Sequence, residues 1–418
     1  MGTAKIHSKV LIIGGGPAGS ASAYWLAMRG VDVTVLEKKT FPRDKTCGDG
    51  LTPRSVAQLE AMGLSDFLAT KHRYIGLRSV AFGRTMELAW PRHHDFPNYG
   101  FVVTRHDLDE AVAENSADKG ANYLFGHEVT GVSLNSDSSI EHLEVKENSS
   151  GDRMLFSADY YVVADGANSR IGRALGAARN RDEPIGLAIR GYHSSPRHDD
   201  QYIESKLDLR DEKNSVVPGY GWIFPLGDGR VNVGIGMLTN QDRWKNFNTT
   251  HALERYIEQA PSYWGLSEKT ELTTPTGGKL PMGFSIDPKS GPNFVLIGDS
   301  AASINPFNGE GISYGYETGR IAADLISDAI DADDRAKLGL YVSVLDKRYA
   351  NYYRLGRRFV KLIADPRILS LSVWAGMHSE PLMKEVVKIM ANLMPTEKKG
   401  VAERAIDQAI RLVDLARA

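Results

Sequence analysis

The sequence predicts an α/β protein that combines a mainly parallel sheet, assembled from separate parts of the chain, with an antiparallel sheet and a helical C-terminal segment. Three observations lead to this prediction. A glycine-rich turn joins a strand to a helix near the N-terminus, and buried strands of the same type return near residues 160 and 294. Strand patterns rich in glycine and aromatic residues dominate from about 184 to 280. Apolar residues at helical spacing follow from residue 311 onward.

The composition is that of a folded protein without a strong charge bias. The 418 residues include 50 Lys and Arg against 52 Asp and Glu, and this net charge of −2 argues against nucleic-acid binding. Cys47 is the single cysteine, so internal disulfides and multi-cysteine metal sites are excluded and a reducing compartment is expected. No apolar run approaches the ~18 residues of a membrane span. The N-terminus lacks the apolar stretch of a secretory signal.

The first elements form a strand–turn–helix–strand unit. Residues 10–13 are a short apolar run, residues 20–28 are compatible with a helix, and residues 31–36 predict a second strand. The turn after the first strand carries GxGxxG spacing, with Gly14, Gly16 and Gly19. Glu37 ends the second strand, where an acidic residue can accept a hydrogen bond from a ribose hydroxyl. A purely structural glycine turn is the alternative, but the complete unit favours a Rossmann-like dinucleotide site.

The remaining elements extend this organisation. Alternating residues from 74 to 90 predict a hairpin that turns near Gly83. Helical and strand patterns then alternate, with a helix near 107–119, strands near 128–134, 141–146, 160–164, 185–192, 220–237 and 294–297, and helices after 311. We therefore expect a dinucleotide-binding domain made of residues 1–73, 101–180 and 286–330, a substrate domain made of residues 74–100 and 181–285, and a helical segment of residues 331–418.

Three further segments indicate which dinucleotide is bound. Asp165-Gly166 and Gly298-Asp299 each stand at the end of a buried strand, where an aspartate can accept a hydrogen bond from a ribityl hydroxyl. A helix opens at Gly311-Ile312, and its N-terminus suits the negative charge of a reduced flavin ring. Residues 41–54 form a loop rich in glycine, proline and charge after Glu37. Together these segments favour FAD as the cofactor.

With these motifs the chain resembles the flavoprotein hydroxylase superfold and, within it, the geranylgeranyl reductase family. The resemblance extends from the N-terminus to about Leu325 and includes the family signature YxWxFP-x(7,8)-GxG. Here the signature consists of residues 220–225, eight further residues, and then residues 234–236. The segment CGDGLTPR at 47–54 looks most like the bacterial branch that reduces a double bond in the menaquinone side chain. The resemblance therefore implies an FAD-dependent oxidoreductase acting on CH–CH groups of an isoprenoid.

The resemblance also implies which residues hold the cofactor. Arg105 stands in VVTRHDLD, where the family places an arginine that contacts the flavin, and Thr46 stands where family members often have proline. The residues expected to contact FAD are Gly14, Gly15, Gly16, Pro17, Ala18, Gly19, Glu37, Lys38, Thr46, Cys47, Gly48, Asp49, Arg105, Val129, Asp299, Gly311 and Ile312.

The signature also has a physical interpretation. On a strand, Tyr220, Trp222 and Phe224 share one face, and on the next strand Gly234 and Gly236 share a face with little side-chain volume. We expect an aromatic wall and a groove that together form a slot for a ribbon-like apolar substrate. An aromatic core stripe with bulge glycines is the alternative. In the slot, the ring faces of Tyr220 and Trp222 are expected to stabilise positive charge on the reacting alkene.

Cys47 is the expected proton donor. A free thiol has a pKa of about 8.5, so it is mostly protonated at neutral pH and can donate a proton. The alternative is that Cys47 only packs beside the flavin and that a trapped water supplies the proton. The predicted catalytic residues are therefore Cys47, Tyr220 and Trp222. No metal site is expected, because His93 and His94 are adjacent and would face opposite ways on a strand.

Partners follow from charge and from the number of nucleotide motifs. Positive charges lie along one predicted helix beside apolar residues, with Arg354, Arg357, Arg358 and Lys361 next to Leu355, Phe359, Val360 and Leu362. This pattern indicates a membrane-surface patch or, alternatively, the solvated face of a packed helix. We expect a peripheral protein on the cytoplasmic side of the membrane, or otherwise a cytoplasmic one. A single GxGxxG unit implies an external electron donor, either NADPH or a redox protein.

Three other functions remain open at this point. A flavin-dependent monooxygenase shares the nucleotide motifs but not the YxWxFP signature. A reductase of geranylgeranyl groups on membrane lipids shares both. A lipid or quinone carrier that uses FAD only structurally would bind its ligand without turnover.

Overall fold

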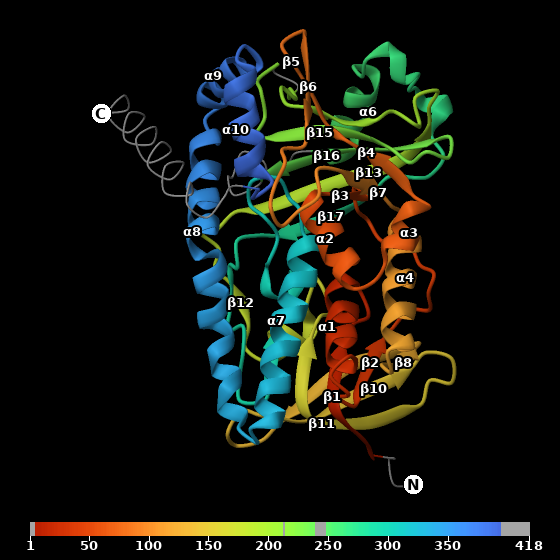
Figure 1. Ribbon diagram of the computed structural model, residues 1–418, viewed down its shortest axis with the longest axis vertical. Coiled ribbons are helices and arrows are strands. Elements are labelled where there is room, and N and C mark those ends of the chain that lie inside the picture. The colour runs from red at the N-terminus through yellow and green to blue at the C-terminus, as the bar shows by residue number, and fades with distance from the viewer. Residues whose placement is uncertain (1–4, 212–213, 239–247, 394–418) are drawn as a thin grey trace, which may run out of the picture.

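The computed structural model describes residues 5–211, 214–238 and 248–393. In this part of the chain, two large sheets lie toward opposite ends of the longest axis, and long helices run beside the first of them (Figure 1). The predicted α/β class, with a mainly parallel sheet, an antiparallel sheet and a helical C-terminal segment, is confirmed.

The first sheet is built around β1 (Lys5–Ile13), which pairs in parallel with β2 (Val33–Glu37) and β11 (Arg153–Val163). The complete order is β8 (Asn122–Phe125), β2, β1, β11, β10 (Ile140–Glu147) and β9 (His127–Leu134), and β19 (Phe294–Leu296) pairs with β11. Successive side chains of β1 enter different apolar clusters, Val10 and Ile12 in one and Leu11 and Ile13 in the other. Burial of both faces explains why these strands are continuous apolar runs.

Helices cover one side of this sheet. The helices α1 (Pro17–Ala27), α4 (Arg105–Asp118) and α7 (Ile312–Asp331) lie side by side in Figure 1. The backbones of α1 and α7 approach closely because glycine lies at their contact. A Cβ at Gly319 would come 2.5 Å from the carbonyl oxygen of Ala18, so no larger residue fits there. This contact packs the N-terminal half of α7 against the first turn of α1, directly after the glycine turn.

The second sheet contains seven strands. Their order is β17 (Thr276–Pro281), β13 (Ile185–Ser194), β16 (Arg230–Leu238), β15 (Gly219–Pro225), β14 (Tyr202–Lys206), β5 (Gly76–Ala81) and β6 (Arg84–Ala89). All neighbouring pairs are antiparallel except β14 and β5. The hairpin predicted near Gly83 is confirmed as β5 and β6. It joins the strands of residues 185–281 in one sheet, although about 100 residues separate them in the chain.

Short elements connect the two sheets. A three-stranded sheet consists of β3 (Gly50–Leu51), β7 (Gly100–Val102) and β4 (His72–Tyr74), and a two-stranded sheet consists of β12 (Ala178–Arg179) and β18 (Ile286–Asp287). The other short elements are α2 (Pro53–Ala61), α3 (Ser65–Ala69), α5 (Arg170–Ala174), α6 (Thr249–Glu258), η2 (Ser262–Trp264), η3 (Glu268–Thr270), η4 (Gly298–Ala301) and η5 (Arg335–Gly339).

The C-terminal helices are α8 (Leu340–Ile363), α9 (Pro366–Met377) and α10 (Glu380–Met390). Most of the expected apolar face of α8 packs inside the protein, because Leu355 and Val360 are buried and the partly buried Phe359 packs against the core cluster of the first sheet. For these apolar residues the structure favours the alternative of a packed helix, and membrane contact of the basic residues beside them stays a prediction. Residues 394–418 lie outside the described part. No helix among the described residues has both the length and the apolarity to cross a membrane.

Candidate active site

The glycine turn between β1 and α1 has the close backbone approach that its sequence predicts. Gly14 has a φ of 101°, and a Cβ on Gly19 would lie 1.9 Å from the carbonyl oxygen of Gly14. Gly16 is different, because a Cβ there would meet only a guanidinium nitrogen of Arg43, at 3.7 Å. Glycine is thus required at positions 14 and 19 by backbone packing within the protein. Beside Gly16, by contrast, there is open space next to the N-terminus of α1. Pro17 and Ala18 begin that helix.

Glu37 lies where the sequence places it, at the end of β2 and buried against the turn. Its Oε2 accepts a hydrogen bond from the Gly15 amide at 2.8 Å, and its Oε1 accepts one from the Lys39 amide at 2.9 Å. Each carboxylate oxygen retains a further lone pair, which a ribose hydroxyl can use. The neighbouring Lys38 is exposed. Two other predicted contacts lie farther along the chain, with Val129 on β9 packed beside the apolar core and Thr46 bonded to Thr276 of β17.

A group of cations lies beside the turn. The guanidinium of Arg105, near the start of α4, forms a bidentate pair with Asp109 at 2.6 and 2.7 Å. Arg43 reaches the same carboxylate, with its Nη2 at 3.2 Å. Desolvation and the positive charge of Arg105 lower the pKa of Lys45, and the negative charge of Asp299 opposes this shift. Arg43 and Asp109 were not predicted, because only the fold brings residues 43 and 109 together. In the sequence, the charged residues of the 41–54 loop were the feature that could have pointed to them.

The loop from β19 to α7 also lies near the glycine turn, because a Cβ on Gly298 would be 2.8 Å from Cβ of Ala18. Asp299 lies in η4, and no hydrogen bond from the described residues reaches its carboxylate. Burial raises the pKa of Asp299, while Lys45 and Arg105 oppose that shift. Gly311 precedes α7, whose first amides, from Ile312 onward, have no side-chain cap. The open glycine turn, an acceptor without a donor and a free helix N-terminus are the groups that a phosphate-containing and hydroxyl-rich cofactor such as FAD requires.

The loop that carries Cys47 is held against the second sheet. The backbone carbonyl oxygen of Cys47 accepts hydrogen bonds from Nε of Arg190 at 3.0 Å and from Nδ2 of Asn232 at 2.9 Å. The thiol sulfur accepts the amide hydrogen of Asp49 at 3.4 Å. Burial and the nearby Asp49 carboxylate raise the pKa of the Cys47 thiol, although Arg105 opposes the shift. The thiol is therefore protonated at neutral pH, as a proton donor requires.

Asp49 turns its side chain toward the antiparallel sheet. Its Oδ2 accepts from the hydroxyl of Tyr192 at 2.5 Å and from Nδ2 of Asn232 at 2.8 Å, while its Oδ1 is buried without a partner. Asn232 in turn accepts from the indole Nε1 of Trp222 at 2.9 Å. Burial raises the pKa of Asp49 to about 6, against the hydrogen bonds of Tyr192 and Asn232. This network connects the Cys47 loop directly to the aromatic signature.

The aromatic wall of the signature is present. The ring centroids of Tyr220 and Trp222 are 5.9 Å apart, and those of Trp222 and Phe224 are 6.2 Å apart. The 47–50 loop lies against this wall, since a Cβ on Gly48 would be 3.4 Å from Phe224 and 3.5 Å from Trp222. The wall and the Cys47 loop therefore form one site.

The predicted empty groove at Gly234 and Gly236 is wrong. Trp222 pairs with Gly234 across the two strands, and a Cβ on Gly234 would lie 2.2 Å from Cζ2 of the indole. The glycine thus accommodates the indole, which is only 5% exposed. Because directly paired residues lie on the same face of a sheet, the glycines support the aromatic wall and do not form the opposite side of a slot.

Glu310 is a site residue that sequence reasoning missed. The hydroxyl of Tyr220 donates to the carbonyl oxygen of Asn308 at 2.7 Å, which joins the wall to the loop before α7. In that loop Glu310 accepts from Thr52 and Ser55 through Oε1, while its Oε2 is buried without a partner. Burial raises the pKa of Glu310, and its proximity contributes to a raised pKa of Tyr220. In the sequence, Glu310 could have been noticed because it stands between two glycines in the segment NGEG.

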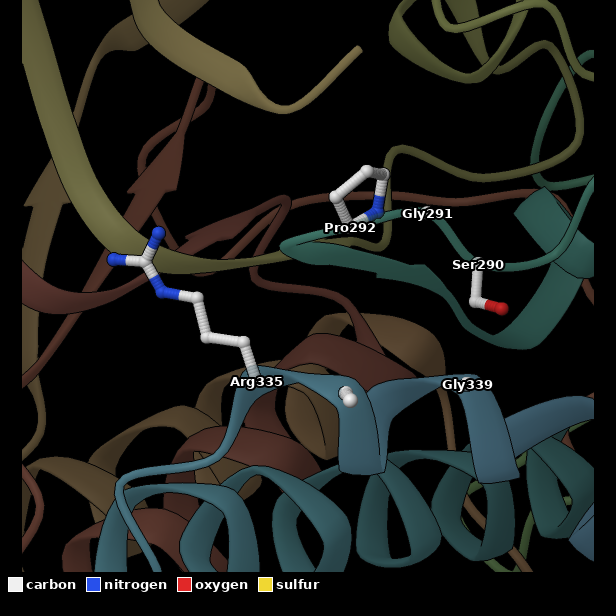
Figure 2. A pocket seen from close by; sticks show the side chains of 6 residues that line it. Ser290, Gly291, Pro292, Arg335 and Gly339 are labelled. Carbon is white, nitrogen blue, oxygen red and sulfur yellow. The ribbon is translucent and has the colours of Figure 1, made fainter. Parts of the chain in front are cut away.

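A surface hollow lies elsewhere. It has a volume of about 450 Å³ and is lined by the turn before β19 and by η5, including Ser290, Pro292 and Arg335 (Figure 2). None of its lining residues belongs to the glycine turn, the Cys47 loop or the aromatic wall. The hollow is therefore separate from the candidate active site.

Comparisons with known proteins agree with this geometry. Residues 7–203 match an FAD binding domain, and residues 212–274 match a geranylgeranyl reductase catalytic domain. The chain is 39% identical to a menaquinone reductase of Mycolicibacterium smegmatis, over 97% of this chain and 98% of that protein. It is 28% identical to digeranylgeranylglycerophospholipid reductase 2 of Methanosphaera stadtmanae, over 84% and 86%.

The fold is also that of a solved relative. A geranylgeranyl bacteriochlorophyll reductase-like protein from Thermoplasma acidophilum superposes with a TM-score of 0.78 at 22% identity, over 96% of this chain and all of that one. The FAD-binding fold, the catalytic-domain match and the full-length relative at 39% identity lead to one conclusion. The chain belongs to the geranylgeranyl reductase family of FAD-dependent oxidoreductases, in its bacterial menaquinone reductase branch.

Proposed function

We propose that this protein reduces one carbon–carbon double bond in the isoprenoid side chain of menaquinone. The observation that carries the proposal is the hydrogen-bonded connection between the Cys47 loop and the Trp222 wall, through Asn232. This connection packs the Cys47 loop against the aromatic rings, and it supports the thiol, whose pKa is raised by burial, as the proton donor. The full-length similarity to a menaquinone reductase supports menaquinone as the substrate.

The chemistry divides between cofactor and protein. Reduced FAD, when bound, supplies the hydride for one alkene carbon. The other carbon needs a proton, which the partly buried Cys47 thiol is proposed to supply. An isolated alkene has no carbonyl to polarise it, so positive charge builds on the more substituted carbon. Trp222 is only 5% exposed, so the ring face proposed to stabilise such charge is that of the partly exposed Tyr220, with Trp222 packed beside it.

Anaerobic turnover tests this function. Enzyme reduced with dithionite is expected to convert menaquinone to a product that is still two mass units heavier than the substrate after its quinone ring has been reoxidised in air. Menaquinone with a fully saturated side chain is the matched control and should show no mass gain after the same reoxidation, because reduction of the ring alone is reversed. A product that forms only in oxygen and gains sixteen mass units would establish a monooxygenase instead.

The similarity to a digeranylgeranylglycerophospholipid reductase supports a second candidate substrate. This similarity covers 84% of this chain, so a geranylgeranyl group on a membrane lipid is the alternative substrate. The same anaerobic assay with a geranylgeranylated glycerophospholipid separates the two. Faster turnover of the lipid than of menaquinone would reverse the assignment.

Both substrates are membrane lipids, so the protein is proposed to work at the cytoplasmic surface of the membrane. The reducing equivalents are proposed to come from NADPH or a redox protein that binds transiently, since the sequence has one GxGxxG unit. Flavin reduction rates with NADPH, compared with those in the presence of a cytosolic reductase fraction, would identify the class of donor.

A further inference from the structure

Two C-terminal helices expose large apolar side chains on their outer side. On α9, Leu371 is 66% exposed and Trp374 is 50% exposed, and on the adjacent α10, Leu382 is 45% exposed. Leu371 and Trp374 are three residues apart and share one face of α9. Trp374 also stacks on His378, with ring centroids 4.2 Å apart. We refer to Leu371, Trp374 and Leu382 as the α9–α10 patch.

Positive charge lies beside this patch. Arg354, Arg358 and Lys361 are exposed and lie at helical spacing along the last turns of α8, which leads directly into α9 (Figure 1). Arg367 is exposed one turn before Leu371 on α9. On α10, Lys384 pairs with Glu380 and Lys388 pairs with Glu385, so these charges add no net charge to the patch.

The inner sides of α9 and α10 pack on the second sheet, where α9 lies against the hairpin of β5 and β6. Met377 and Met383 are buried in an apolar cluster that also includes Tyr192 and Leu226, and Phe224 packs against that cluster. Tyr192 and Phe224 are part of the Asp49 network and the aromatic wall. The cluster under these two helices therefore extends to the active site, and their other side exposes apolar side chains.

We propose that the α9–α10 patch, with the cations of α8 and Arg367, is the surface by which this protein sits on an anionic lipid bilayer. This inference rests on the proposed function, because a polyprenyl substrate has to leave a bilayer. Tryptophan and leucine insert at the boundary between head groups and acyl chains, and the flanking cations contact lipid phosphates. The adjacent positive charge favours an anionic bilayer over a second copy of this chain as the occupant.

Vesicle sedimentation of the FAD-loaded protein tests the surface. Leu371→Glu and Trp374→Glu are each expected to weaken binding to phosphatidylglycerol vesicles about tenfold, while melting temperature and FAD content stay unchanged. Leu340→Glu is the matched control, because Leu340 is 53% exposed at the opposite end of α8 and should bind as the wild type does. Phosphatidylcholine vesicles and high salt should both reduce wild-type binding.

Quenching by brominated lipids locates the contact. Wild-type fluorescence should be quenched more than that of Trp374→Phe. The proposed membrane contact would be overturned if all variants bound the vesicles equally, if quenching were equal, or if the wild type did not bind. It would also be overturned if the protein formed a dimer in solution that Leu371→Glu dissociates. Turnover of detergent-solubilised menaquinone, which should be unchanged in Leu371→Glu, separates these outcomes. If the wild type does not turn over that substrate, the proposed function fails, whatever the vesicles show.

Discussion

At the scale of single residues, the site depends on polar groups whose partners lie far away in the sequence. Asp49 binds Tyr192 and Asn232, which are 143 and 183 residues away. Sequence reasoning identified Cys47, Glu37 and Asp299 from motifs, because motifs are local. It missed Asn232 and Glu310, although a polar residue inside the apolar strand VNVGIGM is itself a signal. The partner of such a residue depends on strand register, which no local pattern specifies.

The buried carboxyl of Asp49 should make stability depend on pH. Its pKa of about 6 lies above the ordinary value of 3.8, so the folded protein binds this proton more readily than the unfolded chain. The resulting stabilisation is present at pH values below 3.8 and is lost as the pH rises through about 6. Asp49→Asn cannot ionise, so between pH 4 and 7.5 it should gain about 2.4 kcal/mol of unfolding free energy relative to the wild type.

Urea unfolding at saturating FAD across that pH range measures the difference. Asp152→Asn, at an exposed aspartate, is the control and should follow the wild-type profile. If the curves of Asp49→Asn and wild type stay parallel, Asp49 is ionised throughout.

The Cys47 thiol should act through its proton. Cys47→Ala should slow alkene reduction in a single anaerobic turnover by about 10²-fold, the lower end of the range for a lost general acid, with FAD still bound. Cys47→Ser keeps a small donor and should be slowed less. A wild-type rate in Cys47→Ala would show that the proton comes from water and that the thiol only packs beside the site.

At the scale of elements, the sequence predicts strands and helices well but not which surfaces they contact. The period-two pattern of β15 correctly placed Tyr220, Trp222 and Phe224 on one face. Pairing of Trp222 with Gly234 then fills the space that was expected to be a groove. Likewise, α8 has an apolar face, but periodicity cannot distinguish a protein core from a membrane, and the structure places Leu355 in the core.

The two glycines of β16 should differ in their tolerance of alanine. A Cβ at Gly234 would lie 2.2 Å from the indole of Trp222 and 2.7 Å from a backbone oxygen of Ile189, whereas at Gly236 the nearest atom is 3.6 Å away. Gly234→Ala should therefore displace Trp222 and destabilise the fold by about 2 kcal/mol. Gly236→Ala should be nearly neutral. Urea unfolding and near-ultraviolet circular dichroism compare them, and equal effects would contradict this packing of the indole.

At the scale of the whole molecule, the proposed cofactor site is made of segments that are distant in the chain. The glycine turn and Glu37 come from the first 40 residues, Arg105 from α4, and Asp299 with the start of α7 from beyond residue 298. GxGxxG and the GD motif were recognisable separately, and the parallel pairing of β1, β11 and β19 brings them together. A ligand that contacts all these segments has to couple their stabilities.

FAD should therefore stabilise the complete protein, and Gly16 allows this effect to be isolated. A ligand that binds only the folded state at 100 times its Kd adds about 2.7 kcal/mol, so the melting temperature should rise with FAD concentration. In Gly16→Val the apoprotein should melt near the wild-type temperature, because a Cβ there meets only Arg43 at 3.7 Å. The valine would nevertheless occupy the space that the pyrophosphate needs, so added FAD should not raise its melting temperature. A shift with FMN equal to that with FAD, or a normal FAD shift in Gly16→Val, would show that the pyrophosphate does not bind at this turn.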